Sequence, residues 1–291
     1  MNPPPRYVVI TPVRNEEHNF PRTIASFAGQ SILPVLWIVV DDGSTDRTGA
    51  IADAAAGAHD WIRVVHRPDR GFRQPGTGVV EAFNDGLARI GGTSWDYLIK
   101  FDGDLAFESD YFEKCFAHFD RDPKLGIGGG LICWSSADGL VGESLGDPAF
   151  HVRGATKIYR RACWEKIGGL FKAPGWDTID ELKANMLGWS TRTFQDIKIH
   201  QLKHTGSADG KWQNWVKNGL ANYITGYHPL FMLAKCLKRI LERPYLVGAV
   251  GLAYGFLKGY VRRIPQVPDR ALIKYVRQQQ LLKLTGRPSI L

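Results

Sequence analysis

The chain has 291 residues, of which 44% are hydrophobic and 23% are charged. This composition excludes a disordered chain and suits one large domain, or a core domain with an appendage. The 37 Lys and Arg residues outnumber the 29 Asp and Glu residues, which gives a formal net charge of +8. The excess favours a polyanionic partner, which charge alone leaves open as a nucleic acid, an acidic lipid or a nucleotide phosphate.

The cysteines indicate neither a zinc site nor a disulfide framework. They are scattered without a Cys-x-x-Cys spacing, at Cys115, Cys133, Cys163 and Cys236. Residues 1–6 lead into an apolar segment without the charged and apolar regions of a signal peptide. We therefore expect a cytoplasmic protein.

Short apolar runs alternate with helical periodicity along the first half of the chain. Strands are expected at 7–11, 36–40, 62–65 and 97–101, and helices within 24–32, 48–56, 80–90 and 109–119. This alternation predicts an α/β fold with a mainly parallel sheet that helices cover on both sides. In such a sheet, ligands bind at the carboxyl ends of the strands.

Two carboxylates separated by one glycine follow the strand expected at 97–101. Asp102 and Asp104 are hard oxygen ligands of the kind that hold Mg²⁺ or Mn²⁺ beside nucleotide phosphates. The same pattern also occurs by chance at solvated strand ends.

Two further segments with suggestive chemistry follow earlier strands, at 11–17 and 41–46. Taken singly, the acidic residues of the first segment suit the first turn of a helix, and Asp42-Gly43-Ser44 suits a plain turn. Their arrival with Asp102 and Asp104 at successive strand ends instead indicates a nucleotide site.

Four segments, in this order, resemble the family 2 glycosyltransferases of the GT-A fold that build surface glycans in bacteria and archaea. They are residues 11–17, 39–46, 70–73 and 102–104, and the resemblance covers roughly the first 200 residues. It implies a Rossmann-like fold with a nucleotide-sugar donor and a Mg²⁺ or Mn²⁺ cofactor. The implied donor-binding residues are Pro12, Arg14, Glu16, Asp42, Arg73 and Asp102, and the implied metal ligands are Asp102 and Asp104.

The resemblance also implies an acidic catalytic base in the segment 175–181. Asp177 lies 11 positions before Gly188, where the family has its base, so it ranks first and Asp180 second. A base is needed because an acceptor hydroxyl is a poor nucleophile until it loses its proton. Direct displacement would invert the anomeric carbon. For Asp180 and Glu181, the favoured alternative is a charge interaction with the helix N-terminus.

A pair of histidines follows at His200 and His204. Their spacing of four suits one helix face or a polar connection, and a zinc site is not favoured because no third ligand is close in sequence. His204 is a candidate for the border of the donor diphosphate and its metal.

The character of the chain changes after residue 210. We expect a catalytic domain at 1–210 and a helical region at 211–291, with an amphipathic helix near 232–241 and an apolar run at 245–260. The run is short for a bilayer span and suits a re-entrant or interfacial helix at the inner face of a membrane, where the basic segment 270–283 would meet anionic lipid. The alternative is a helix buried against the catalytic domain or in an oligomer interface.

These observations predict a metal-dependent, inverting glycosyltransferase that acts on a glycan or lipid-linked acceptor at a membrane surface. Nucleic-acid binding is disfavoured because no fold signature for it appears. A dinucleotide dehydrogenase needs a glycine-rich first turn that residues 11–17 lack. A sugar-1-phosphate nucleotidyltransferase and a sugar-nucleotide binding protein without transferase activity are the remaining alternatives.

Overall fold

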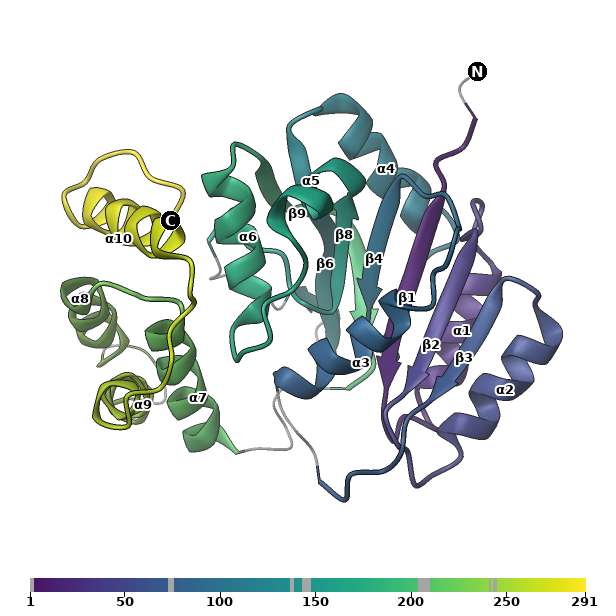
Figure 1. Ribbon diagram of the computed structural model, residues 1–291, viewed down its shortest axis with the longest axis horizontal. Helices are drawn as coiled ribbons and strands as arrows, with labels where there is room; N and C mark the ends of the chain where they lie inside the picture. Colours follow the sequence, from purple (N-terminus) through teal and green to yellow (C-terminus); the bar gives the residue numbers. More distant parts are fainter. Residues whose placement is uncertain are drawn as a thin grey trace.

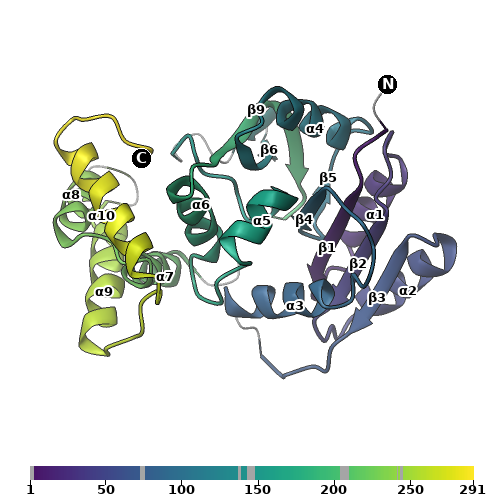
Figure 2. The same cartoon turned by 45° about the horizontal axis from the view of Figure 1, so that its top comes forward.

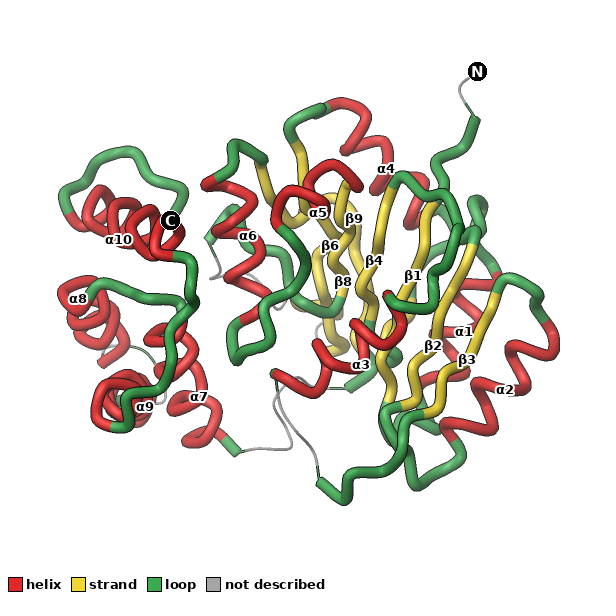
Figure 3. Tube along the Cα trace, viewed as in Figure 1, coloured by secondary structure: helices red, strands yellow, loops and turns green. Residues whose placement is uncertain are grey.

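The computed structural model describes residues 3–72, 76–136, 139–142, 148–203, 210–240, 242 and 245–291. Within these ranges the chain forms nine strands and ten helices (Figures 1 and 3). The strands are β1 (Tyr7–Val13), β2 (Leu36–Asp41), β3 (Ile62–His66), β4 (Tyr97–Phe101), β5 (Leu105–Ala106), β6 (Leu125–Ser136), β7 (Gly139–Gly142), β8 (Thr156–Arg160) and β9 (Ser190–Gln201). The helices are α1 (Phe20–Ala28), α2 (Thr48–Ala58), α3 (Thr77–Leu87), α4 (Tyr111–Arg121), α5 (Arg161–Ile167), α6 (Trp176–Met186), α7 (Lys211–Ile224), α8 (Pro229–Ile240), α9 (Val247–Val261) and α10 (Arg270–Leu284).

All the described strands belong to one sheet with the order β3-β2-β1-β4-β8-β6-β9-β5, and β7 pairs with β6. Strands β1 to β4 are mutually parallel, as the alternation of strands and helices predicts. Beyond them β8 runs antiparallel to β4 and to β6, while β9 runs parallel to β6. The predicted α/β fold is therefore confirmed, and the predicted parallel pairing holds for β1 to β4. The described sheet as a whole is mixed, because antiparallel pairs enter beyond β4.

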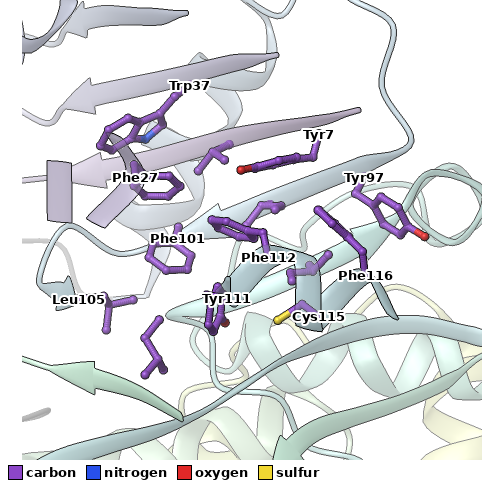
Figure 4. Packing of buried hydrophobic residues seen from close by; sticks show 14 of the residues in the cluster. Tyr7, Phe27, Trp37, Tyr97, Phe101, Leu105, Tyr111, Phe112, Cys115 and Phe116 are labelled. Atoms are coloured by element: carbon purple, nitrogen blue, oxygen red, sulfur yellow. The ribbon is translucent and has the colours of Figure 1, made fainter. Parts of the chain in front are cut away.

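Helices cover both faces of the sheet because alternate residues of each central strand point to opposite sides. Tyr7 and Val9 of β1 face the cluster that includes residues of α1 and α4, whereas Val8 and Ile10 face α3 and α5 (Figure 2). The first cluster is rich in aromatic rings, among them Trp37 (Figure 4). Burial on both faces explains why these strands read as unbroken apolar runs.

The C-terminal helices α7 to α10 lie together at the end of the molecule opposite α2 and β3 (Figure 1). They share a third apolar cluster with α6, which includes Leu182 of α6, Leu252 of α9 and Leu272 of α10. Helices α7 and α9 approach closely, since a Cβ atom on Gly255 would lie 2.0 Å from the carbonyl oxygen of Val216. Among the described helices, none combines the length and the apolar character needed to cross a bilayer.

Candidate active site

Three parallel neighbours, β2, β1 and β4, end at the same edge of the sheet and place the predicted loops together. Val13 pairs with Asp41 at the ends of β1 and β2, and β4 pairs with the other side of β1. Asp42 donates its backbone N–H to the carbonyl of Val13 at 2.8 Å. The loop after β4 carries Asp102 and Asp104.

The loops after β1 and β2 are joined by hydrogen bonds to backbone amides. Asn15 and Glu16 donate their N–H groups to the hydroxyls of Ser44 and Thr48, at 3.0 and 2.8 Å. Asn15 has a φ of 54°, in the left-handed region that few residues other than glycine adopt. The sharp turn at Asn15 therefore holds the acidic residues of the β1 loop beside the β2 loop.

Asp42 is the centre of a charged cluster that sequence reasoning only partly found. Its carboxylate pairs with both Arg67 and Arg70, and its backbone carbonyl accepts a 2.6 Å hydrogen bond from Arg14. Arg14 also pairs with Asp69 at 2.6 Å. The structure thus brings the predicted donor-binding residues Arg14 and Asp42 together, and it adds two arginines. Arg73, the predicted phosphate contact, lies outside the described residues.

Asp102 and Asp104 flank a glycine that the packing requires. A Cβ atom on Gly103 would lie 2.5 Å from Cγ1 of Val13, so a larger residue would force the Val13 side chain to shift. Asp104 is buried and accepts a 3.3 Å hydrogen bond from Gln201. Burial, followed by the negative charges of Asp102 and Glu16, raises the pKa of Asp104 to about 7.

The donor set suits a divalent cation. Asp104 is close enough to Asp102 and Glu16 for their negative charges to raise its pKa, and a cation would relieve that repulsion. Asp102 and Glu16 are meanwhile paired with Lys100 and Lys203. In the described ranges no group of three His, Cys, Asp or Glu side chains is arranged as a complete metal site. Asp102 and Asp104 would therefore supply only part of a coordination sphere, which water and phosphate oxygens commonly complete for Mg²⁺.

Asp177 lies in the first turn of α6, next to the segment that borders Asp102. The carbonyl of Ala155 accepts a 3.0 Å hydrogen bond from the N–H of Asp102, and the preceding Gly154 packs against Asp177. Lys100 joins the same two regions, since its ammonium pairs with Asp102 and lies 5.6 Å from the ring centroid of Trp176. In the structure, only the segment 154–155 therefore separates Asp177, the first-ranked base candidate, from the predicted metal ligand Asp102.

Asp180 and Glu181 of α6 belong to a buried ionic network. The ammonium of Lys157 contacts Asp180 at 2.8 Å and Glu181 at 2.7 Å, and Tyr159 donates its hydroxyl proton to Asp180 at 2.6 Å. The expectation that these carboxylates serve the helix N-terminus is wrong, because their partners are the buried Lys157, Tyr159 and His151 of the neighbouring segments. This full burial favours Asp177 over Asp180 as a group that meets an acceptor.

Burial and neighbouring charges shift the pKa values of the residues in this network. Burial raises the pKa of Asp180 to about 6, with Lys157 opposing that rise. Burial disfavours the charged form of His151, but its 2.9 Å contact with Glu181 outweighs burial and raises the pKa of the imidazole. Lys157 likewise keeps a raised pKa against its burial because Asp180 and Glu181 surround it.

Only one histidine of the pair, His200, lies among the described residues. His200 lies in β9, paired with Ala106 of β5, so it does not belong to a helix. His204, the candidate for the diphosphate border and metal, lies outside the described residues. Sequence reasoning missed two lysines, Lys100 inside the otherwise apolar strand β4 and Lys157 in β8, whose first four residues are buried.

Comparison with known proteins shows the family to which the chain belongs. Residues 8–169, more than half of the chain, match the Glycosyl transferase family 2. The chain belongs to this family. The match includes the three strand-end loops and ends before Asp177, so the assignment of a base rests on the geometry of α6.

A curated relative of this family 2 chain is the polyprenol monophosphomannose synthase of Mycolicibacterium smegmatis. The two are 29% identical over 182 residues, which cover 57% of this chain and 66% of the relative, just under two thirds of its length.

Two solved structures share the fold with low sequence identity. The mannosyltransferase PcManGT of Pyrobaculum calidifontis, in complex with GDP-Man and Mn²⁺, has a TM-score of 0.57 and 16% identity, covering 96% of this chain and 81% of that one. TarS 1–349 of S. aureus, in complex with UDP-GlcNAc, has a TM-score of 0.54 and 16% identity, covering 97% and 92%. These likenesses establish the GT-A fold and confirm the predicted fold class.

Proposed function

We propose that this family 2 chain transfers a hexosyl group from a nucleotide sugar to a hydroxyl of a lipid-linked or surface-glycan acceptor, with inversion at the anomeric carbon. The observation that carries the proposal is the convergence of three loops at one sheet edge, with Asp177 one chain segment away from Asp102. The named donors of the structural neighbours are GDP-Man and UDP-GlcNAc, and the curated relative is a mannose synthase. We therefore place GDP-mannose first among the donors to test.

The charges at the sheet edge suit a donor that carries a diphosphate. Asp102 and Asp104 would hold Mg²⁺ or Mn²⁺, which supplies neutralisation of the negative charge on the departing nucleotide diphosphate. Arg14 and the arginines that contact Asp42 lie along the ends of β1 and β2, where the nucleotide would bind. Pro12 and Glu16 complete this side at the end of β1 and in the loop after it.

Asp177 is our proposed general base. It is partly exposed at the start of α6, whereas Asp180 is fully committed to Lys157 and Tyr159. Its carboxylate would take the proton of the acceptor hydroxyl as the oxygen attacks the anomeric carbon from the face opposite the diphosphate. An acceptor phosphate is already anionic near neutral pH and needs no such base, so loss of Asp177 distinguishes the two acceptor types.

The surface of α8 and α9 supports a membrane location for the acceptor. One face of α9 packs against α7 through its glycines, while Tyr254, Leu257 and Val261 on the other side are 53%, 59% and 82% exposed. Leu230, Leu233 and Leu237 are similarly exposed along α8. The apolar run thus packs against α7 within the helical region and presents its remaining apolar side chains at the surface. Such a face beside cations suits the interfacial region of a bilayer.

The charge distribution supports the same location. Residues 211–291 contain 14 Lys and Arg against two Asp and Glu, a formal charge of +12, which leaves −4 on residues 1–210. The whole positive excess thus belongs to the helical region, where it would attract the anionic inner leaflet.

A nucleotide-release screen tests the proposal. The full chain is incubated with UDP-, GDP- and dTDP-sugars and with Mg²⁺ or Mn²⁺, with and without a membrane lipid extract. We expect release from one donor that requires the metal and increases with lipid. Metal-dependent binding without release in any lipid extract would favour a sugar-nucleotide binding protein, and absence of donor binding would contradict the assigned site.

A further inference from the structure

A hollow of about 970 Å³ lies along α10, apart from the candidate active site. Its lining includes four cationic side chains, Arg270, Lys274, Arg277 and Arg287, and no aspartate or glutamate. Ile273 and Leu281 contribute apolar surface between the cations. The combination of clustered cations with apolar walls suits an amphipathic anion.

The walls of the hollow are held in place by the loop between α7 and α8. Arg277 donates from Nε to the carbonyl of Gly226 at 2.9 Å, and Gln280 accepts the N–H of His228 at 2.7 Å. Gly226 has a φ of 82°, and a Cβ atom there would lie 2.8 Å from Ile273. Arg277 is therefore positioned before any ligand arrives, which lowers the entropic cost of binding.

The acidic residues of the helical region are engaged elsewhere. Asp269 caps α10 by accepting the N–H of Leu272 at 3.0 Å, and its other carboxylate oxygen lies 3.7 Å from Lys183 of α6. Glu242 pairs with Arg239. Among the described residues, no ion pair neutralises Arg270, Lys274 or Arg287, so these three cations are available to an external anion.

We propose that the α10 hollow binds the terminal phosphate of a lipid, a phosphate monoester whose acyl or isoprenoid chain extends into the bilayer. A monoester presents up to two negative charges and three oxygen acceptors, which several cations can contact together. A lipid source fits better than free phosphate because Leu281 and Leu284 are exposed on the same helix and the apolar faces of α8 and α9 belong to the same helical region. The site rests on the membrane contact in the proposed function, and it does not depend on sugar transfer.

Vesicle flotation with the full chain tests the site. Phosphatidylcholine vesicles are doped with phosphatidic acid, a phosphate monoester, or with phosphatidylglycerol, a diester, at matched surface charge. We expect the wild-type chain to bind the monoester vesicles about 10-fold or more tightly than the diester vesicles, as charge-assisted hydrogen bonds predict. Inorganic phosphate at the same concentration of monoester should compete weakly.

Lys274→Gln and the matched variant Lys238→Gln of α8 separate the hollow from general attraction. Each removes one exposed positive charge of the helical region. Lys274→Gln should abolish the preference for monoester vesicles, whereas Lys238→Gln should weaken both kinds of vesicle equally, by about fivefold at most. The proposal would be overturned if both variants lost the preference for monoester vesicles equally, or if the wild type showed no such preference. It would also be overturned if inorganic phosphate bound as strongly as the monoester vesicles. Nucleotide release in detergent should be unchanged in both variants, so failure of the hollow and failure of the transferase proposal are distinguishable.

Discussion

At the scale of single residues, the site depends on carboxylates that the fold holds at an energetic cost. Asp104 is buried beside the negative charges of Asp102 and Glu16, and its pKa rises to about 7 as a result. A buried carboxylate of this kind destabilises the protein when it is ionised and lacks a cation. Binding and stability are thus linked at Asp104.

Asp104→Asn should separate these two effects. Because asparagine keeps the shape and removes the charge, the variant should melt at the same temperature as the wild type or higher when Mn²⁺ is absent. It should lose the rise in melting temperature that Mn²⁺ and donor give the wild type, with donor affinity at least about 10-fold weaker. Glu165→Gln, which removes an exposed carboxylate of α5, is the control. A full Mn²⁺ response in Asp104→Asn would contradict the metal assignment.

His151 should make stability depend on pH. Its contact with Glu181 raises the pKa of the folded state above the value of 6.5 for an unperturbed imidazole. The stabilisation is therefore fully present below that unfolded value, and it is lost as pH rises through the raised pKa. His151→Gln should lower the free energy of unfolding by roughly 1–3 kcal/mol in acidic buffer and by less in alkaline buffer.

Denaturant unfolding at both pH values measures this difference. His18→Gln, at a side chain that is 90% exposed, should give the same small change at either pH. A deficit for His151→Gln that stays constant or increases toward alkaline pH would contradict the role of the protonated imidazole.

At the scale of elements, the sequence predicts the strands and helices of the first half because each of them buries apolar residues that recur with its own periodicity. The expected strands at 36–40 and 97–101 correspond to β2 and β4, and the expected helix at 48–56 corresponds to α2. The helix expected from Ser109 begins at Tyr111, with Asp110 as the preceding residue. The sequence predicts the bounds of such segments to within about one helical turn, because the periodicity of apolar residues depends only on neighbouring positions.

Other features could not be predicted because they depend on contacts between distant residues. Lys157 of β8 meets Asp180 and Glu181 only after β8 has inserted antiparallel between β4 and β6. The same insertion places Gly154 and Ala155 between Asp102 and Asp177. The sequence resemblance thus found the candidate residues and ranked Asp177 above Asp180, whereas the folded chain was needed to show that Asp180 is buried against Lys157 and Tyr159.

The contact between α7 and α9 gives a prediction at this scale. Gly255→Ala places a methyl carbon 2.0 Å from the carbonyl oxygen of Val216, so it should destabilise the helical region by roughly 1–3 kcal/mol. Gly57→Ala in α2 has open space around the new methyl group and should be neutral or stabilising by up to about 1 kcal/mol. Thermal melts of both variants make the comparison. Equal melting temperatures would mean that α7 and α9 do not pack as closely as described.

At the scale of the whole molecule, residues 1–210 and residues 211–291 have opposite formal charges, −4 and +12. Together with the exposed faces of α8 and α9, this polarity would orient the chain with its helical end toward an anionic membrane. Helix α6 connects the two parts, since it carries Asp177 and also packs in the apolar cluster of the C-terminal helices.

Leu257→Glu should weaken binding to phosphatidylcholine vesicles by about 10-fold or more, because an apolar side chain that enters the interface is replaced by a charge. Leu33→Glu changes an exposed leucine of the catalytic part and should leave vesicle binding unchanged. Flotation assays compare the two variants. Equal binding by both would show that the face of α9 does not enter the membrane.

The most direct test of the account compares donor binding and sugar transfer in the wild type and in Asp177→Asn. With Mn²⁺, the donor found in the release screen and a lipid extract as acceptor, the variant should bind donor as the wild type does. It should transfer sugar about 10²- to 10⁴-fold more slowly, because a general base contributes that much. Near-normal transfer by Asp177→Asn would contradict the choice of base, and with it the claim that the acceptor is a hydroxyl activated at the start of α6.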